Sequence, residues 1–200
     1  MISESSRCSR RGARSFVAGG LALSLLAALS GGCVTAPSDG VREYLDEKSA
    51  ATVTVAARPI VFARERPELA VHARDYLTIV PVDVNRAGTH VLYFYGYAWS
   101  TIDKRSLGNA TAATPQFELI ADGRRIPLTP VTTAPRAIGL AEPPLKAPAD
   151  SAQLLISTTS REVLAFLADA TDVRVVAVQA GVGERYTIWA DGRAAIAALL

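Results

Sequence analysis

The sequence predicts a mainly β protein, an antiparallel β-sandwich or sheet with one or two packed helices. Short runs rich in β-branched and aromatic residues follow one another from residue 51 onward, and turn-forming residues separate several of them. One later stretch, residues 160–170, carries its apolar side chains at helical spacing instead. These three observations favour a sheet with few helices, and a two-layer α+β domain is the alternative.

Four strands are expected in the first half of the domain. They are Thr52–Val55, Ile60–Phe62, Tyr76–Val84 and His90–Ile102. Pro59 separates the first two strands, and Pro81 predicts an edge position or a bulge for the third, because proline has no N–H to donate. Asn85-Arg86-Ala87-Gly88 is a turn signal that predicts a hairpin between the third and fourth strands.

The second half of the domain is also expected to consist mainly of strands. Its expected strands are Phe117–Ile120, Arg125–Leu128, Gln153–Ser157, Val173–Gln179 and Tyr186–Trp189. Asp122-Gly123 accepts the positive φ angles of a tight turn and predicts a hairpin between the first two. Residues 127–148 hold six of the eleven prolines, which predicts an extended surface connection without internal hydrogen bonds.

Two helices are expected near the end of the chain. Ser160 is a suitable N-cap for Arg161–Ala170, in which four apolar side chains lie on one stripe, and Asp191 is a suitable cap for Gly192–Leu200. The stripe consists of Val163, Leu164, Phe166 and Leu167. A further brief helix is expected at Val41–Ser49.

The first 32 residues are expected to be an export signal. Four arginines precede a 14-residue apolar run, Phe16–Leu29. This run is shorter than the roughly 20 apolar residues that a membrane-spanning helix needs, and Gly31 and Gly32 break a helix directly after it. The export signal is therefore expected to be cleaved off. Ser9-Arg10-Arg11 leaves open whether export is general-secretory or twin-arginine.

Leu29-Ser30-Gly31-Gly32-Cys33 resembles the lipobox of bacterial lipoproteins, in which the cysteine is acylated and becomes the new N-terminus. It departs from the commonest pattern because Leu29 lies four residues before the cysteine and Ser30 takes the usual leucine position. The resemblance covers only the signal. It implies lipidation of Cys33, and Val34 in place of an aspartate implies the periplasmic face of the outer membrane, with the inner membrane or secretion as alternatives.

These features divide the chain into three parts: a signal peptide (1–32), a lipidated N-terminus and tether (33–50), and a single β-rich globular domain (51–200). Within the tether, residues 35–40 are small and polar and contain one proline and one glycine.

Removing the signal changes the charge and cysteine content. The whole chain has 21 basic and 19 acidic residues, whereas the part from Cys33 onward has 17 and 18. A near-neutral domain lacks the basic surface of a nucleic-acid-binding protein, so no nucleic-acid partner is expected. Cys8 lies in the signal and Cys33 is the attachment site, which leaves the domain without a thiol for a disulfide or a metal.

No catalytic residue, metal site or cofactor is expected from the sequence. The two histidines, His72 and His90, do not have metal-binding spacing, and nucleophile-elbow and phosphate-loop motifs are missing. A carboxylate pair for glycoside hydrolysis could be formed only if folding brought Asp75 close to Asp83 or Asp103. Surface positions for the histidines and turn or ion-pair roles for the aspartates are the simpler interpretation.

One constellation is a candidate binding site. Strand alternation within His90–Ile102 places four aromatic side chains on one face, with Gly96 behind them. They are Tyr93, Tyr95, Tyr97 and Trp99. Their combined surface of roughly 600–1,000 Å² exceeds what a monomer usually leaves exposed. Packing under the Arg161–Ala170 helix is therefore favoured over a partner-protein surface or a small-ligand groove.

Three functions follow from these expectations. The first is a non-catalytic structural or interaction module, anchored by lipid in the cell envelope, whose partner is an envelope protein or a cell-wall component near the membrane. The second is an envelope module that binds a glycan or peptide through the aromatic strand. The third is an exported hydrolase that uses His72, His90 and nearby aspartates.

Overall fold

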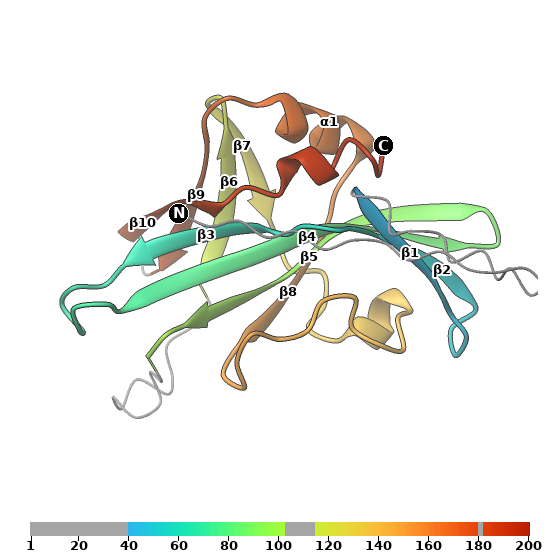
Figure 1. Cartoon of the computed structure of the whole chain (residues 1–200), viewed down its shortest axis with the longest axis horizontal. Helices are drawn as coiled ribbons and strands as arrows, with labels where there is room; N and C mark the ends of the chain where they lie inside the picture. The colour runs from blue at the N-terminus through green and yellow to red at the C-terminus, as the bar shows by residue number, and fades with distance from the viewer. Residues whose placement is uncertain (1–39, 103–114, 180–181) are drawn as a thin grey trace, which may run out of the picture. The chain divides into compact units, whose positions relative to one another are not determined.

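The computed structural model describes residues 40–102, 115–179 and 182–200. They form one antiparallel sheet with a single α-helix, so the predicted fold class is confirmed (Figure 1). The strands are β1 (Val41–Asp46), β2 (Ala51–Ala56), β3 (Ile60–Glu65), β4 (Arg74–Arg86), β5 (Thr89–Ser100), β6 (Gln116–Ala121), β7 (Arg124–Leu128), β8 (Gln153–Thr158), β9 (Val173–Gln179) and β10 (Val182–Ala190). The helices are α1 (Arg161–Asp169) and the short 3₁₀ turns η1 (Pro135–Ile138) and η2 (Arg193–Ala195).

Strand β4 organises the sheet because it has three partners. It pairs with β5 along its whole length, with β3 through residues 74–79 and with β2 through residues 82–85. Beyond β3 the sheet continues through β10, β9, β6 and β7, while β1 follows β2 and β8 follows β5. Every pairing is antiparallel.

Pro81 lies where β4 exchanges one neighbour for another, and not at an edge or in a bulge as the sequence predicted. Ile79 is the last residue of β4 that pairs with β3, and Val82 is the first that pairs with β2. This gap in pairing accommodates a residue without an N–H group. Proline is therefore compatible with an interior strand at this position.

Both predicted tight turns are confirmed. Ala87 and Gly88 join β4 to β5 with φ angles of 48° and 85°, and Asp122 and Gly123 join β6 to β7 with φ angles of 44° and 82°. Two successive positive φ angles are typical of the two-residue turn that matches the twist of a hairpin.

The core lies on both faces of the β4–β5 pair. On one face, the fully buried Phe62, Leu77 and Leu119 belong to the same core as Leu164 and Leu167 of α1. On the other face, the segment 129–152 between β7 and β8 covers the sheet and contributes the buried Leu140. Figure 1 shows α1 and this segment on opposite sides of the sheet.

Helix α1 matches the predicted helix at Arg161–Ala170. The Ser160 side chain accepts a hydrogen bond from the Val163 backbone N–H, which confirms the N-cap.

Three local expectations were wrong. Val41–Ser49 forms β1 and a turn, since six register pairs with β2 outweigh the weak tendency of so short a segment to be helical. The sheet therefore extends into the segment predicted to be tether.

The segment Gly192–Leu200 holds only η2 and turns, although Asp191 does accept a hydrogen bond from the Arg193 N–H at 3.0 Å. Close contact between Gly192 and the Arg58–Pro59 backbone holds the start of this segment against the body.

The proline-rich connection also differs from the prediction. It contains η1, whose turn is closed by an internal hydrogen bond from the Ala137 N–H to the Ala134 carbonyl. It is not purely a surface segment either, because Leu140 is fully buried. The apolar residues between the prolines draw it onto the sheet.

Candidate functional site

The predicted aromatic stripe lies on one face of β5, but its members have different environments. Tyr95 is fully buried and Tyr97 is 7% exposed, whereas Tyr93 and Trp99 are only partly buried. The centre of the stripe therefore belongs to the core. Only its two ends reach the surface.

The cover over the centre is the segment 129–152 and not α1, as the sequence analysis expected. The Tyr97 hydroxyl donates to the Leu145 carbonyl oxygen at 3.1 Å, and the hydroxyls of Tyr95 and Tyr97 lie 3.4 Å apart. Burial raises the pKa of Tyr95 well above its ordinary value, as does its contact with the Tyr97 hydroxyl. These hydrogen bonds give the buried phenols polar partners, which makes their burial tolerable.

An exposed aromatic cluster surrounds the Trp99 end. The Trp99 ring stacks on Tyr76 of β4, with ring centroids 4.3 Å apart and an interplanar angle of 13°. Trp189 of β10 meets Tyr76 edge-on at 6.2 Å, and the Arg74 guanidinium lies 4.6 Å from the centre of the Trp189 ring. We call Arg74, Tyr76, Trp99 and Trp189 the aromatic cluster.

The sheet brings these residues together from three strands. Tyr76 is the register partner of Trp99 on one side and of Ala63 on the other. The small side chain of Ala63 lets Tyr76 reach Trp189 on the far side of β3. Sequence reasoning identified Trp99 but missed Tyr76, Trp189 and Arg74, because only the order β10, β3, β4, β5 makes them neighbours.

Exposure within the aromatic cluster rises from its centre outward. Tyr76 is 9% exposed, while Trp189 is 57% exposed. The Trp99 Nε1–H donates to Thr78 Oγ1 at 3.2 Å, so this ring is held on two sides. Trp189 therefore presents a large apolar surface on a rigid base.

A cavity of about 280 Å³ lies at the other end of the stripe. Tyr93 contributes to its wall together with Arg86 of β4 and Ile138 of η1. Burial raises the pKa of Tyr93, and the positive charge of Arg86 acts in the opposite direction. The sequence analysis named Tyr93 as a site residue but assigned Arg86 only to a turn, because no local pattern shows that the β4–β5 hairpin lies beside η1.

The residues considered for catalysis are distributed over different parts of the fold. His90 Nδ1 lies 2.7 Å from Asp83 Oδ2, whereas His72 is exposed in the β3–β4 loop. Asp75 pairs with Arg66 at 2.7 Å. Asp75 and Asp83 are eight positions apart on β4, about 26 Å along the strand, which exceeds the spacing of a glycosidase carboxylate pair. Asp103, like Cys33, lies outside the described residues.

Several charged side chains surround Tyr186 of β10. Arg64 of β3 pairs with Glu184 of β10, and Arg66, which directly follows β3, pairs with Asp75 of β4. Burial, followed by the charges of Asp75 and Glu184, raises the pKa of Tyr186 to about 12. Paired charges of this kind are typical of a structural network.

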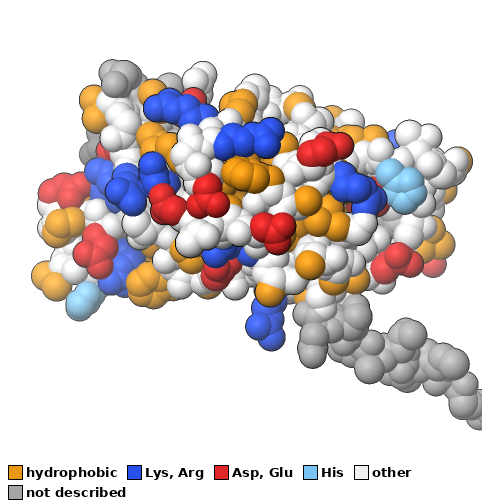
Figure 2. Space-filling model, turned by 90° about the horizontal axis from the view of Figure 1, so that it is seen from above, with side chains coloured by type: hydrophobic (Ala, Val, Ile, Leu, Met, Phe, Trp, Pro, Cys, Tyr) orange, Lys and Arg blue, Asp and Glu red, His pale blue; other side chains and the backbone are white. Residues whose placement is uncertain are grey.

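Within the described ranges, no three His, Cys, Asp or Glu side chains come close enough to bind a metal ion. None of the helices in those ranges has the length and apolar character required to cross a bilayer. On the face displayed in Figure 2, basic and acidic side chains alternate with apolar ones.

Comparison with known proteins gave no match: no family model, curated protein or solved structure is similar to the chain.

Proposed function

We propose that this protein is a non-catalytic interaction module, held in the bacterial envelope by a lipid on Cys33, and that it docks a partner through the aromatic cluster. The observation that carries the docking surface is the 57% exposure of Trp189 beside Arg74. Trp, Tyr and Arg are the residues most enriched at the energetic centres of protein interfaces.

The packing of the aromatic cluster favours docking over a passive surface position. Trp189 is supported from behind by Tyr76, which is itself stacked on Trp99. A side chain held in this way loses little conformational entropy when a partner covers it. The Arg74 guanidinium extends the surface with a cation whose ion pair, to Glu65 at 3.0 Å, is exposed.

The proposed anchor restricts where this partner can be. Six residues lie between Cys33 and Gly40, the first described residue, and the seven steps along the chain reach only about 25 Å even when fully extended. The folded body then remains close to the bilayer. An envelope protein or a cell-wall component near the membrane is the kind of partner that this geometry allows.

Site-specific photocrosslinking in living cells tests the proposal. A photoreactive residue replaces Trp189 in one variant and Val131 in a control, because Val131 has a similar exposure of 50% but lies in the proline-rich segment. We expect a discrete adduct at position 189 and none at position 131. We also expect the position-189 adduct to disappear when Cys33→Ser is added. Equal labelling at both positions, or no adduct at 189, would contradict the docking surface.

The structure leaves fewer residues of the aromatic stripe available for the alternative function, ligand binding. A groove along the whole stripe would need exposed rings at Tyr95 and Tyr97, and both are buried. The Tyr93 end, which lines a partly open cavity, is the part of the stripe that still offers a small molecule a binding space.

A further inference from the structure

The cavity at the β4–β5 hairpin has an amphipathic wall. Register pairs Val84 with Val91 and Arg86 with Thr89, which places all four side chains on the same face as Tyr93. Ala137 and Ile138 of η1 contribute the rest of the wall. The wall is therefore part apolar, from Val84, Val91 and Ile138, and part polar, from one cation and two hydroxyl groups.

Arg86 is held in position by the backbone of Gly139. Its Nη2 donates to the Gly139 carbonyl oxygen at 2.5 Å. Gly139 has a φ of 78°, and a Cβ at this position would lie 1.2 Å from Nη2 of Arg86. Glycine is thus needed both for the backbone conformation and for the approach of the guanidinium. The hydrogen bond orients the exposed guanidinium toward η1.

The charge of Arg86 is not matched by a neighbouring acid. In the part of the chain that the structure describes, no carboxylate forms an ion pair with Arg86. A guanidinium has five N–H donors in a planar fork, and the bond to Gly139 uses one of its terminal nitrogens. The remaining donors suit a carboxylate, which accepts two parallel hydrogen bonds from such a fork.

The size of the cavity limits the apolar part of a ligand. A closed cavity of about 150 Å³ holds one benzene molecule. The present cavity has a volume of about 280 Å³ and is partly open to solvent, so roughly ten to twelve non-hydrogen atoms of a ligand fit within its walls. Together with the single cation, this volume favours an anionic head with a short apolar tail over a polyphosphate or a sugar.

We propose that the cavity between the β4–β5 hairpin and η1 binds a small amphipathic monocarboxylate, with its carboxylate on Arg86 and its apolar tail along Val84, Val91 and Ile138. This site is separate from the aromatic cluster and does not depend on the function proposed for that cluster. The Tyr93 and Thr89 hydroxyls are available to the second carboxylate oxygen.

Calorimetric titration of the full chain in phosphatidylcholine nanodiscs tests this site. The probe is 4-phenylbutanoate, and the comparison compounds are 4-phenylbutan-1-ol, acetate and inorganic phosphate. We expect saturable binding of the probe only, because it alone has both a carboxylate and a tail of suitable size. Binding of the alcohol with equal affinity, binding of phosphate instead, or no saturable binding of the probe would overturn the proposal.

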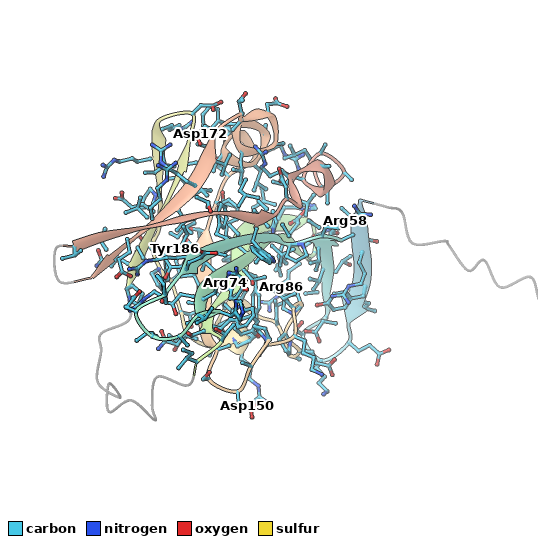
Figure 3. All side chains as sticks on the ribbon, turned by 60° about the vertical axis from the view of Figure 1, so that its left-hand side comes forward. Arg58, Arg74, Arg86, Asp150, Asp172 and Tyr186 are labelled. Carbon is cyan, nitrogen blue, oxygen red and sulfur yellow. The ribbon has the colours of Figure 1, made fainter. Side chains whose placement is uncertain are left out.

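Variants identify the residues that carry this binding. Arg86→Gln should weaken probe binding at least tenfold, since it removes a charge-assisted hydrogen bond. Ala137→Leu, which extends a wall residue into the cavity, should weaken it comparably without changing the charge. Arg58→Gln is the matched control, because Arg58 is an exposed arginine on another loop (Figure 3) and should bind as wild type does. Unchanged binding in both cavity variants would contradict the site.

Discussion

At Gly96 the backbones of β4 and β5 approach so closely that no side chain fits. A Cβ at this position would lie 2.0 Å from the Thr78 carbonyl oxygen and 2.9 Å from the Ile79 Cα. The sequence analysis placed Gly96 behind the aromatic stripe, and in the structure the backbone of β4 lies directly against it.

Gly96→Ala should therefore be severely destabilising. Relief of the clash requires the two central strands to separate, so we expect the free energy of unfolding to fall by about 3 kcal/mol, the upper end of the usual range for overpacking. Gly183→Ala is the control, since its Cβ would meet only Val176 Cγ1, at 3.3 Å, and should cost less than about 1 kcal/mol. Urea unfolding measures both. Similar losses in the two variants would show that close approach at Gly96 does not limit stability.

Tyr186 should make the protein sensitive to alkali. Its pKa in the folded state is raised to about 12, above the value near 10 of an unfolded tyrosine. The contribution of the protonated Tyr186 to the free energy of unfolding is fully present below pH 10. It is lost as the pH rises toward 12, because the tyrosine of the unfolded chain releases its proton at a lower pH. The loss amounts to about 3 kcal/mol. Thermal unfolding between pH 8 and pH 12 should show a smaller decrease in Tyr186→Phe than in wild type; equal decreases would exclude Tyr186 as the cause.

At the scale of elements, β1 and the proline-rich segment hold each other in place. The buried Asp46 carboxylate at the end of β1 accepts a hydrogen bond from the Ala141 N–H at 2.6 Å. Arg42 of β1 donates to the Pro144 carbonyl oxygen at 2.6 Å. The segment that covers Tyr95 and Tyr97 is therefore fixed to the first strand of the domain.

Acid should loosen this cover. The Ala141 N–H lowers the pKa of Asp46 below its ordinary value near 4. The contribution of Asp46 is thus present above that value and is lost as the pH falls through the lowered pKa. We expect amide-exchange protection at Ala141 to fall in acid for wild type, to be low at every pH in Asp46→Ala, and to lose its acid dependence in Asp46→Asn. An acid loss that persists in Asp46→Asn would point to another group.

Elements defined by local chemistry could be predicted, and those defined by distant partners could not. Asp122-Gly123 and Ser160 act within a few residues of their own position, so turn and cap rules were sufficient. Val41–Asp46 is a strand only because β2 pairs with it. The Asp122 carboxylate also accepts hydrogen bonds from the Thr171 and Asp172 backbone N–H groups, a contact between positions about fifty residues apart that no local pattern reveals.

At the scale of the whole molecule, the candidate site depends on strand order. Alternation correctly placed Tyr93, Tyr95, Tyr97 and Trp99 on one face, but the cover and the neighbours of that face come from distant segments. Trp189 approaches Tyr76 only because β10 lies beside β3. Sheet order is set by long-range pairing, which a single sequence does not encode in local patterns.

The lipid anchor gives a prediction for the whole molecule. Cys33→Ser removes the acylation site, so we expect the protein to move from the membrane fraction to the soluble fraction of the cell. Cys8→Ser is the matched control because Cys8 lies within the expected signal peptide, and it should leave the protein on the membrane. Membrane association of the Cys33→Ser variant would contradict lipid anchoring.

Mass spectrometry of the N-terminal peptide, from protein purified out of bacterial membranes, tests the central claim most directly. Anchoring at Cys33 predicts a mature chain that begins at this residue and carries covalently bound acyl groups. A mature chain that begins elsewhere, or that begins at an unmodified Cys33, would contradict it.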